Sequence, residues 1–224
     1  MPDRIQIKEE AKQVLRGARV NPYLVSLIVV GVLGLLGGLD SYVGASQTVD
    51  QMAGYDPDLA AMLPSFPEFP VLLVAFVAAV NWLAQAILSA GWSIYHLGVR
   101  RGKEMPFSCL LDGFGFLGKL ILLNIVMSIF VFLWSLLFYI PGLIAQYRYR
   151  FAVYNLCENP DIGIMEAISM SKAQTAGFKW TLFVLDLSFI GWILLSGLTL
   201  GILDIWLAPY REQANVGYFQ EIKR

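Results

Sequence analysis

The sequence predicts an all-α fold: a polytopic transmembrane helical bundle with short interfacial amphipathic helices. Of the 224 residues, 57% are hydrophobic and only 15% are charged, whereas soluble domains carry about 25% charged residues. The mean hydropathy is +0.62. Because so few polar residues cannot cover a water-facing surface, a soluble enzyme is excluded. The abundance of Leu, Ile, Val and Phe also excludes a disordered chain. The net charge of −1 gives no basic excess for nucleic-acid binding.

Residues 1–20 are predicted to form a cytoplasmic amphipathic helix at the membrane surface. An apolar face and a basic face recur at helical spacing, made respectively of Ile7, Ala11, Val14, Leu15, Ala18 and of Arg4, Lys8, Lys12, Arg16, Arg19. This pattern is typical of a helix held at anionic lipids. The alternative is a solvated helix that only precedes the first span.

Residues 21–224 are predicted to form the transmembrane domain. A span needs about 20 apolar residues, and the clearest candidates are 22–39, 69–97, 117–140 and 180–198. Two further segments, 143–156 and 201–219, mix apolar with charged residues. If both cross the membrane, the chain has six spans, which is the arrangement we expect. A four-span arrangement would merge these segments with their neighbours or lay them on the membrane.

The distribution of Lys and Arg predicts the orientation of the chain. Neither residue occurs between Arg19 and Arg100, whereas Arg100, Arg101 and Lys103 follow the second predicted span. The intervening stretch, at about 41–68, contains acidic residues and prolines and is expected to be an outer loop. The positive-inside rule therefore places the N-terminus in the cytoplasm. Both the six-span and the four-span arrangement return the C-terminus there, as in a multi-pass protein of the cell membrane.

Charged residues inside the apolar segments form the clearest candidate site. Buried ionisable groups are costly and normally face partners within the bundle, so we expect Asp186 to pair with Arg150 or Arg211, beside Tyr147 or Tyr210. The complete candidate cluster is Arg148, Arg150, Asp186, Arg211, Tyr147 and Tyr210. It is either a site for an anion or a lipid headgroup, or a structural ion pair beside arginines that extend to the headgroups.

A second candidate is a polar helix face in the second span. Its members recur every four residues: Asn81, Gln85, Ser89 and Ser93. Such side chains either hydrogen-bond to neighbouring helices or line a hydrated pathway.

Gly34 and Gly38 in the first span form a GxxxG pair, which is compatible with packing inside the monomer and with dimerisation.

Motifs along nearly the whole chain carry a resemblance to a known family. They are Arg4…Lys8…Ala11-Lys12…Leu15-Arg16-Gly17, Gly91…Leu97-Gly98…Arg101-Gly102…Phe107…Leu110…Gly113-Phe114, Asn159-Pro160-Asp161…Glu166-Ala167…Ser171-Lys172, Gly177-Phe178-Lys179-Trp180…Phe183…Asp186-Leu187-Ser188-Phe189-Ile190-Gly191-Trp192, Thr199-Leu200-Gly201 and Pro209-Tyr210. Together they resemble a bacterial integral membrane family of unknown function, the domain of unknown function 975. The resemblance implies a polytopic membrane protein and assigns no catalytic or binding residues.

Three function classes are weighed. The first is a non-catalytic envelope module that assembles with other membrane proteins, with lipids or with itself. The second is a small transporter, or a lipid- or anion-handling protein, that uses the Arg/Asp cluster. An enzyme ranks third, because phosphate loops, HExxH and GxSxG motifs are missing from the sequence. With one histidine and two separated cysteines, Cys109 and Cys157, neither a metal site nor a cofactor is expected.

Overall fold

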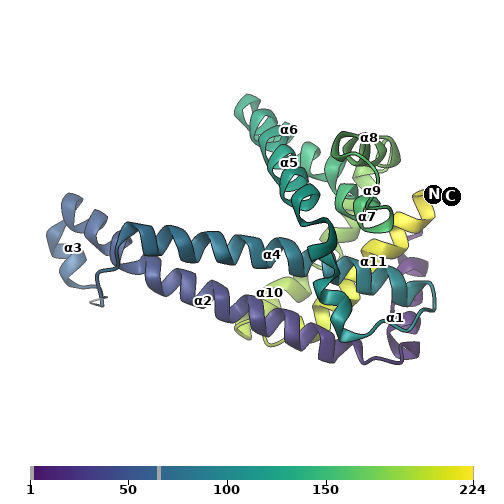
Figure 1. The fold of residues 1–224 in the computed structure, drawn as a ribbon, viewed down its shortest axis with the longest axis horizontal. Coiled ribbons are helices and arrows are strands. Elements are labelled where there is room, and N and C mark those ends of the chain that lie inside the picture. The colour runs from purple at the N-terminus through teal and green to yellow at the C-terminus, as the bar shows by residue number, and fades with distance from the viewer. Residues whose placement is uncertain (1–2, 65–66, 224) are drawn as a thin grey trace. The chain divides into compact units, whose positions relative to one another are not determined.

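The structure is a computed structural model that describes residues 3–64 and 67–223 (Figure 1). The described residues form helices and no strands, which confirms the all-α prediction. The elements are α1 (Arg4–Gly17), α2 (Pro22–Tyr55), α3 (Pro57–Ala61), α4 (Val71–Arg100), the 3₁₀ helix η1 (Phe107–Phe116), α5 (Leu117–Leu137), α6 (Tyr139–Tyr149), α7 (Ala152–Glu158), α8 (Ile164–Gln174), α9 (Lys179–Leu187), α10 (Ile190–Leu198) and α11 (Asp204–Lys223).

Four segments of the described chain are long and apolar enough to cross a membrane. They are Pro22–Tyr55, Val71–Arg100, Phe107–Leu137 and Lys179–Leu198. The six predicted spans are not confirmed. The mixed segment at 143–156 is divided between the short helices α6 and α7, and α11 is long enough but too polar to qualify. Four spans are the number that helix length and composition support.

The chain divides into two compact units, one of which runs from Val30 to Gln85. This unit contains most of α2, all of α3 and the first half of α4. The ring of Tyr42 on α2 lies edge-on to the ring of Phe69, in the segment that leads into α4, with centroids 6.1 Å apart. Helix α2 extends to Tyr55, so part of the stretch expected to be an outer loop is helical. The polar residues of this stretch do not break the helix. The next proline after Pro22, which begins α2, is Pro57, so α2 contains no internal proline.

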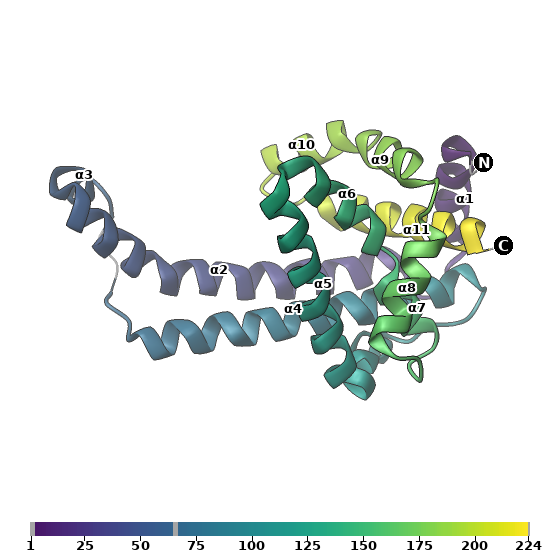
Figure 2. The same ribbon diagram turned by 90° about the horizontal axis from the view of Figure 1, so that it is seen from above.

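The other unit comprises the residues up to Val29 and those from Ala86 onward. In it α1 packs along α11, as both views show (Figures 1 and 2). Ile7, Ala11 and Leu15, which recur every four residues, are buried in this contact. The apolar face of α1 is therefore covered by protein, whereas Arg4, Lys12 and Arg16 on the same helix are exposed.

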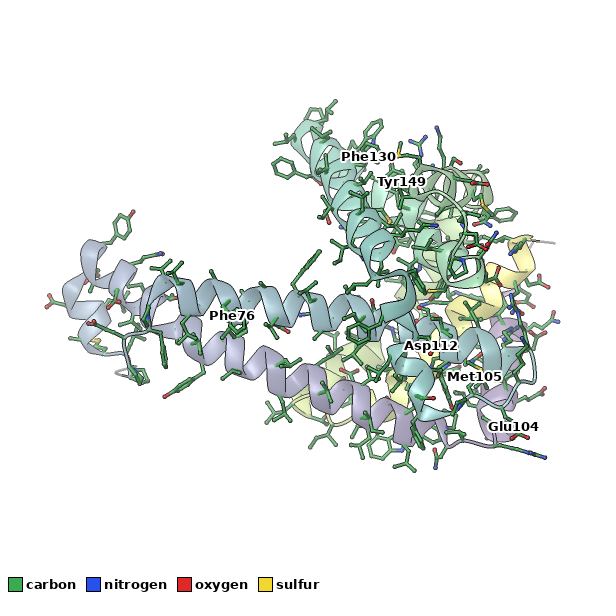
Figure 3. The ribbon with its side chains drawn as sticks, viewed as in Figure 1. Phe76, Glu104, Met105, Asp112, Phe130 and Tyr149 are labelled. Carbon is green, nitrogen blue, oxygen red and sulfur yellow. The ribbon has the colours of Figure 1, made fainter. Side chains whose placement is uncertain are left out.

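A second core of this unit lies between α5, α6, α7 and α8. Helices α5 and α6 run side by side as a tight hairpin (Figure 2). Gly142 allows this approach, because an added Cβ would overlap the hydroxyl of Ser135. Further along, the rings of Phe130 and Tyr149 lie 5.9 Å apart (Figure 3). Buried Leu123, Leu156 and Ile168 are among the residues that complete this core.

The apolar segment Lys179–Leu198 is not one continuous helix. Helix α9 ends before Ser188, whose hydroxyl donates a hydrogen bond of 2.6 Å to the carbonyl of Leu185, and α10 begins after Phe189. Gly177 before α9 and Gly201 after α10 have φ angles of 82° and 83°. Glycine adopts this left-handed conformation without a steric penalty, so the chain can turn sharply at both ends of the segment.

Candidate functional site

The site is built on a break between α6 and α7, at Arg150 and Phe151. A helix break leaves backbone groups without partners, and here α8 supplies them. The amide of Phe151 donates to the hydroxyl of Ser171 (3.1 Å), which in turn donates to the carbonyl of Arg148 (3.0 Å). The hydroxyl of Thr175 donates to the same carbonyl (3.3 Å). Two buried hydroxyls, of Ser171 on α8 and of Thr175 directly after it, therefore fix the backbone that carries Arg150.

Arg150 is the centre of a polar network that joins three elements. Its guanidinium donates through Nη1 to Oδ2 of Asp186 (2.5 Å) and through Nη2 to Oδ1 (2.8 Å). The Nη2 atom also donates to Oδ1 of Asn215 on α11 (2.9 Å), and the Tyr147 hydroxyl donates to Oδ2 of Asp186 (3.0 Å). Bidentate pairs of this kind are the strong form of the arginine–carboxylate interaction.

The network is only partly buried. The side chains of Arg150 and Asp186 are 19% and 30% exposed, respectively. A cavity of about 240 Å³ adjoins them and is lined by Gln146, Tyr147, Arg150 and Asp186. Because Asp186 neutralises Arg150 inside this cavity, the pair offers polar atoms but no net charge to a ligand.

The structure brings together three residues of the predicted cluster, Arg150, Asp186 and Tyr147. It leaves the side chains of the other three outside the network. Arg148 contributes its carbonyl oxygen, Arg211 has no ion-pair partner among the described residues, and Tyr210 packs edge-on against Phe189 with ring centroids 5.3 Å apart.

Asn215, the second hydrogen-bond partner of Arg150, is not among the site residues predicted from the sequence. An amide in a helix of mixed polarity such as α11 has no periodic signal that distinguishes it from an exposed residue. Its position relative to Arg150 depends on the packing of α11 against the other helices, which the sequence pattern does not encode.

The predicted polar face of α4 divides between the two units. Within the Val30–Gln85 unit, the amide of Asn81 donates to the carboxylate of Asp40 on α2 (3.3 Å), and Gln85 donates to Asn81 (3.2 Å). The first contact is a hydrogen bond between neighbouring helices, one of the two interpretations that the spacing allows, and the second lies within α4.

In the other unit, the two serines of the predicted face have different environments. The hydroxyl of Ser89 bonds to the carbonyl of Ala86 in its own helix (2.9 Å). The hydroxyl of Ser93 donates to Glu212 on α11 (3.2 Å), and the same carboxylate oxygen accepts a hydrogen bond from Tyr154 (2.8 Å). Burial raises the pKa of Glu212 above its ordinary value of 4.5.

Another buried polar pair joins α4 to α11. The side-chain amide of Gln213 lies 2.9 Å from Nδ1 of His96 and donates to the carbonyl of His96 at 3.0 Å. Both side chains are fully buried.

Among the described residues, no group of three or more His, Cys, Asp and Glu side chains could hold a metal. Cys109 and Cys157 are both free.

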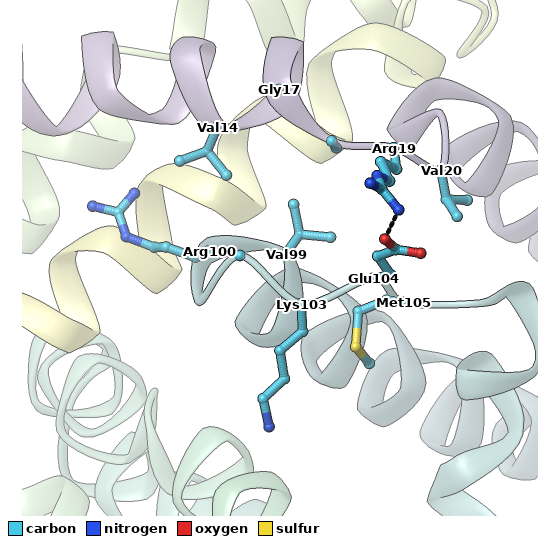
Figure 4. Close-up of a pocket in the computed structure, with 11 residues that line it drawn as sticks. Val14, Gly17, Arg19, Val20, Val99, Arg100, Lys103, Glu104 and Met105 are labelled. Atoms are coloured by element: carbon cyan, nitrogen blue, oxygen red, sulfur yellow. Dashed lines mark ion pairs between the residues drawn. The ribbon is translucent and has the colours of Figure 1, made fainter.

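Ion pairs attach α1 and its following loop to the end of α4 and to the segment after it. Arg100 pairs with Glu10 of α1 (2.6 Å), and Arg19 pairs with Glu104. Figure 4 shows the second pair at the edge of a cavity of about 440 Å³. The guanidinium of Arg100 lies on the side near α11, where it packs against Gly217. This cavity therefore lies between two electrostatic contacts that hold α1 in place.

Comparisons with known proteins concern the C-terminal part of the chain. No curated protein and no solved structure matches the sequence significantly. A family model matches residues 136–224, a range that contains Arg150, Asp186 and Asn215. The motifs expected nearer the N-terminus, from Arg4 to Phe114, lie outside this match. The resemblance is therefore confirmed over residues 136–224, which match the family described as Protein of unknown function (DUF975).

Proposed function

We propose that the chain is a non-catalytic integral membrane module that assembles with other membrane proteins or with lipids. The observation that carries this proposal is that the hydrogen-bonding groups of the Arg150–Asp186 pair are occupied by partners within the chain. Both carboxylate oxygens of Asp186 accept hydrogen bonds from within the chain, and Arg150 also contacts Asn215. A group that is engaged in this way ties α6, α9 and α11 together. It therefore supports a structural role more strongly than the release and capture of a cargo.

An open helix face supports assembly. Within the Val30–Gln85 unit, a Cβ added at Gly34 or Gly38 of α2 would meet no other atom within 4 Å. Small residues on membrane helices allow close approach of another helix. Packing inside this unit does not account for the pair, so a partner helix from another protein or a second copy is the occupant that we propose.

Native mass spectrometry of the protein, extracted gently from its own membrane, tests this proposal. We expect a defined second protein, or a second copy of the chain, in the spectrum. Gly34→Leu should remove that partner, whereas Gly44→Leu should retain it, because Gly44 lies on a different face of α2 and its added Cβ also meets no atom within 4 Å. A monomer without protein partners, or equal loss in both variants, would refute assembly through this face.

The second candidate function is that of a transporter or an anion-handling protein. The cavity of about 240 Å³ beside Arg150 and Asp186 favours it, because a polar ligand could reach the pair there. In that case the mass spectrum should show a retained small anion that Arg150→Ala abolishes. Retention of the same anion in Arg150→Ala would exclude this site.

We also propose that both termini lie in the cytoplasm and that the chain resides in the cell membrane. The support is the positive-inside rule applied to the stretch without Lys or Arg between Arg19 and Arg100. Reporter fusions at the two ends test the orientation. An outer-face signal from either fusion would contradict it.

A further inference from the structure

A groove lies between α1, α10 and α11, apart from the Arg150 network. Its volume is about 430 Å³. Charged residues of α1 line one side, and aromatic and aliphatic residues of α10, α11 and the segment between them line the other. The lining includes Lys8, Glu9, Lys12, Trp192, Trp206 and Tyr210.

Lys8 is the unusual charge in this groove. Its ammonium donates to the hydroxyl of Ser188 (2.8 Å) and to the carbonyl of the same residue (3.3 Å), and it lies 4.1 Å from the centre of the Phe189 ring. These partners occupy the break between α9 and α10, and all of them are uncharged. Across residues 3–64 and 67–223, no carboxylate forms an ion pair with Lys8.

The surroundings of Lys8 favour an anion. Burial, followed by the positive charges of Arg4 and Lys12, lowers the pKa of Lys8 below 10.5. The neighbouring Lys12 is paired with Glu9 at 2.8 Å, so the lining carries one positive charge in excess. An ammonium has three donors, and the two bonds to Ser188 leave one for a ligand.

The opposite wall of the groove is apolar but open. Trp192 is 53% exposed and Trp206 is 52% exposed, with Leu203 between them in sequence. Trp is enriched where hydrocarbon meets the headgroup region, because its ring is apolar and its N–H is polar. A cationic wall beside an aromatic wall matches an amphiphile with one negative charge.

We propose that this groove binds an anionic glycerophospholipid, with its phosphodiester at Lys8 and its acyl chain along Trp192 and Trp206. The single negative charge of the phosphodiester complements the excess positive charge of the lining. The acyl chain covers the exposed indole rings, which a free phosphate ion cannot do. The inference rests on the proposed residence in a membrane and on assembly with lipids, but not on the protein partner proposed at Gly34 and Gly38.

The test counts lipids that stay bound to the purified protein in native mass spectra, after exchange into mixed phosphatidylglycerol and phosphatidylcholine. We expect phosphatidylglycerol to be retained preferentially. Lys8→Gln should weaken this retention about fivefold, the effect of one lysine near an anionic surface. Lys8→Arg, which keeps the charge, should largely restore it.

Two further variants separate the groove from its surroundings. Arg16→Gln makes the same charge change at an exposed position of α1 outside the groove and should leave retention unchanged. Trp206→Ala alters an exposed side chain, so the fold should persist while retention falls. Equal loss in Lys8→Gln and Arg16→Gln, equal retention of the two lipids, or full displacement by inorganic phosphate would overturn the proposal.

Discussion

Replacing Asp186 with asparagine should destabilise the protein by removing the charge that neutralises Arg150. Truncating one partner of a buried ion pair costs about 3–5 kcal/mol, whereas exposed pairs contribute about 1 kcal/mol or less. The side chains of Arg150 and Asp186 are 19% and 30% exposed, which places this pair between the two limits. The amide of asparagine also cannot accept every bond that Asp186 accepts from Arg150 and Tyr147. We therefore expect Asp186→Asn to cost about 2 kcal/mol.

Thermal unfolding in a mild detergent, followed by tryptophan fluorescence, measures this loss. For a chain of this length, about 2 kcal/mol corresponds to a fall of about 4–8 °C in the melting temperature. Asp112→Asn is the matched control, because Asp112, labelled in Figure 3, makes no ion pair among the described residues and is exposed. The combined variant Arg150→Met and Asp186→Leu should recover much of the loss, since apolar residues can replace a buried pair. Equal shifts for Asp186→Asn and Asp112→Asn would refute the structural role.

Three further changes test other contacts by the same assay. Gly91→Ala should cost about 3 kcal/mol, because the new methyl group would overlap the backbone carbonyl of Leu110, which cannot rotate away. Ser171→Ala should cost about 2 kcal/mol, because the buried amide of Phe151 loses its acceptor. Glu212→Gln should flatten the dependence of stability on pH. Burial raises the pKa of Glu212 in the folded protein, so its contribution is complete below pH 4.5 and is lost as the pH rises through the folded pKa.

The controls for these variants use positions of the same residue type. Gly118→Ala should be neutral or slightly stabilising, because no atom lies within 4 Å of its added Cβ and alanine favours a helix. Ser169→Ala removes only a local bond of an exposed hydroxyl to the carbonyl of Glu166 and should change stability little. Unchanged melting of Gly91→Ala or Ser171→Ala would contradict the packing described, and a wild-type pH slope in Glu212→Gln would exclude that carboxyl as its source.

The long apolar helices were predictable because their apolar runs exceed the thickness of a bilayer. The residues at which these helices end were less predictable. The first span was expected to end near residue 39, where polarity rises, but polarity alone does not break a helix, and α2 continues to Tyr55. The absence of proline between residues 23 and 56 is a signal that could have extended the prediction.

The pairing of Asp186 with an arginine could be expected because an isolated charge in an apolar segment is costly. Which arginine pairs with Asp186 could not be predicted from the sequence. Arg150 is selected by the break between α6 and α7, which depends on the hydroxyls of Ser171 and Thr175, 20 or more residues further along the chain. Helix breaks of this kind are set by tertiary contacts, so neither Asn215 nor the exclusion of Arg211 follows from spacing.

The Arg150 network also has a consequence for the synthesis of the protein. Arg150 precedes Asp186 by 36 residues and Asn215 by 65. At a translation rate of about 5–20 residues per second, the arginine exists for about 2–7 s before its counter-charge is made, and longer before the network is complete. During that interval an uncompensated guanidinium disfavours entry into hydrocarbon. The network cannot form until α9 and α11 have been synthesised, so the packing of the break between α6 and α7 against these two helices is a late step in folding.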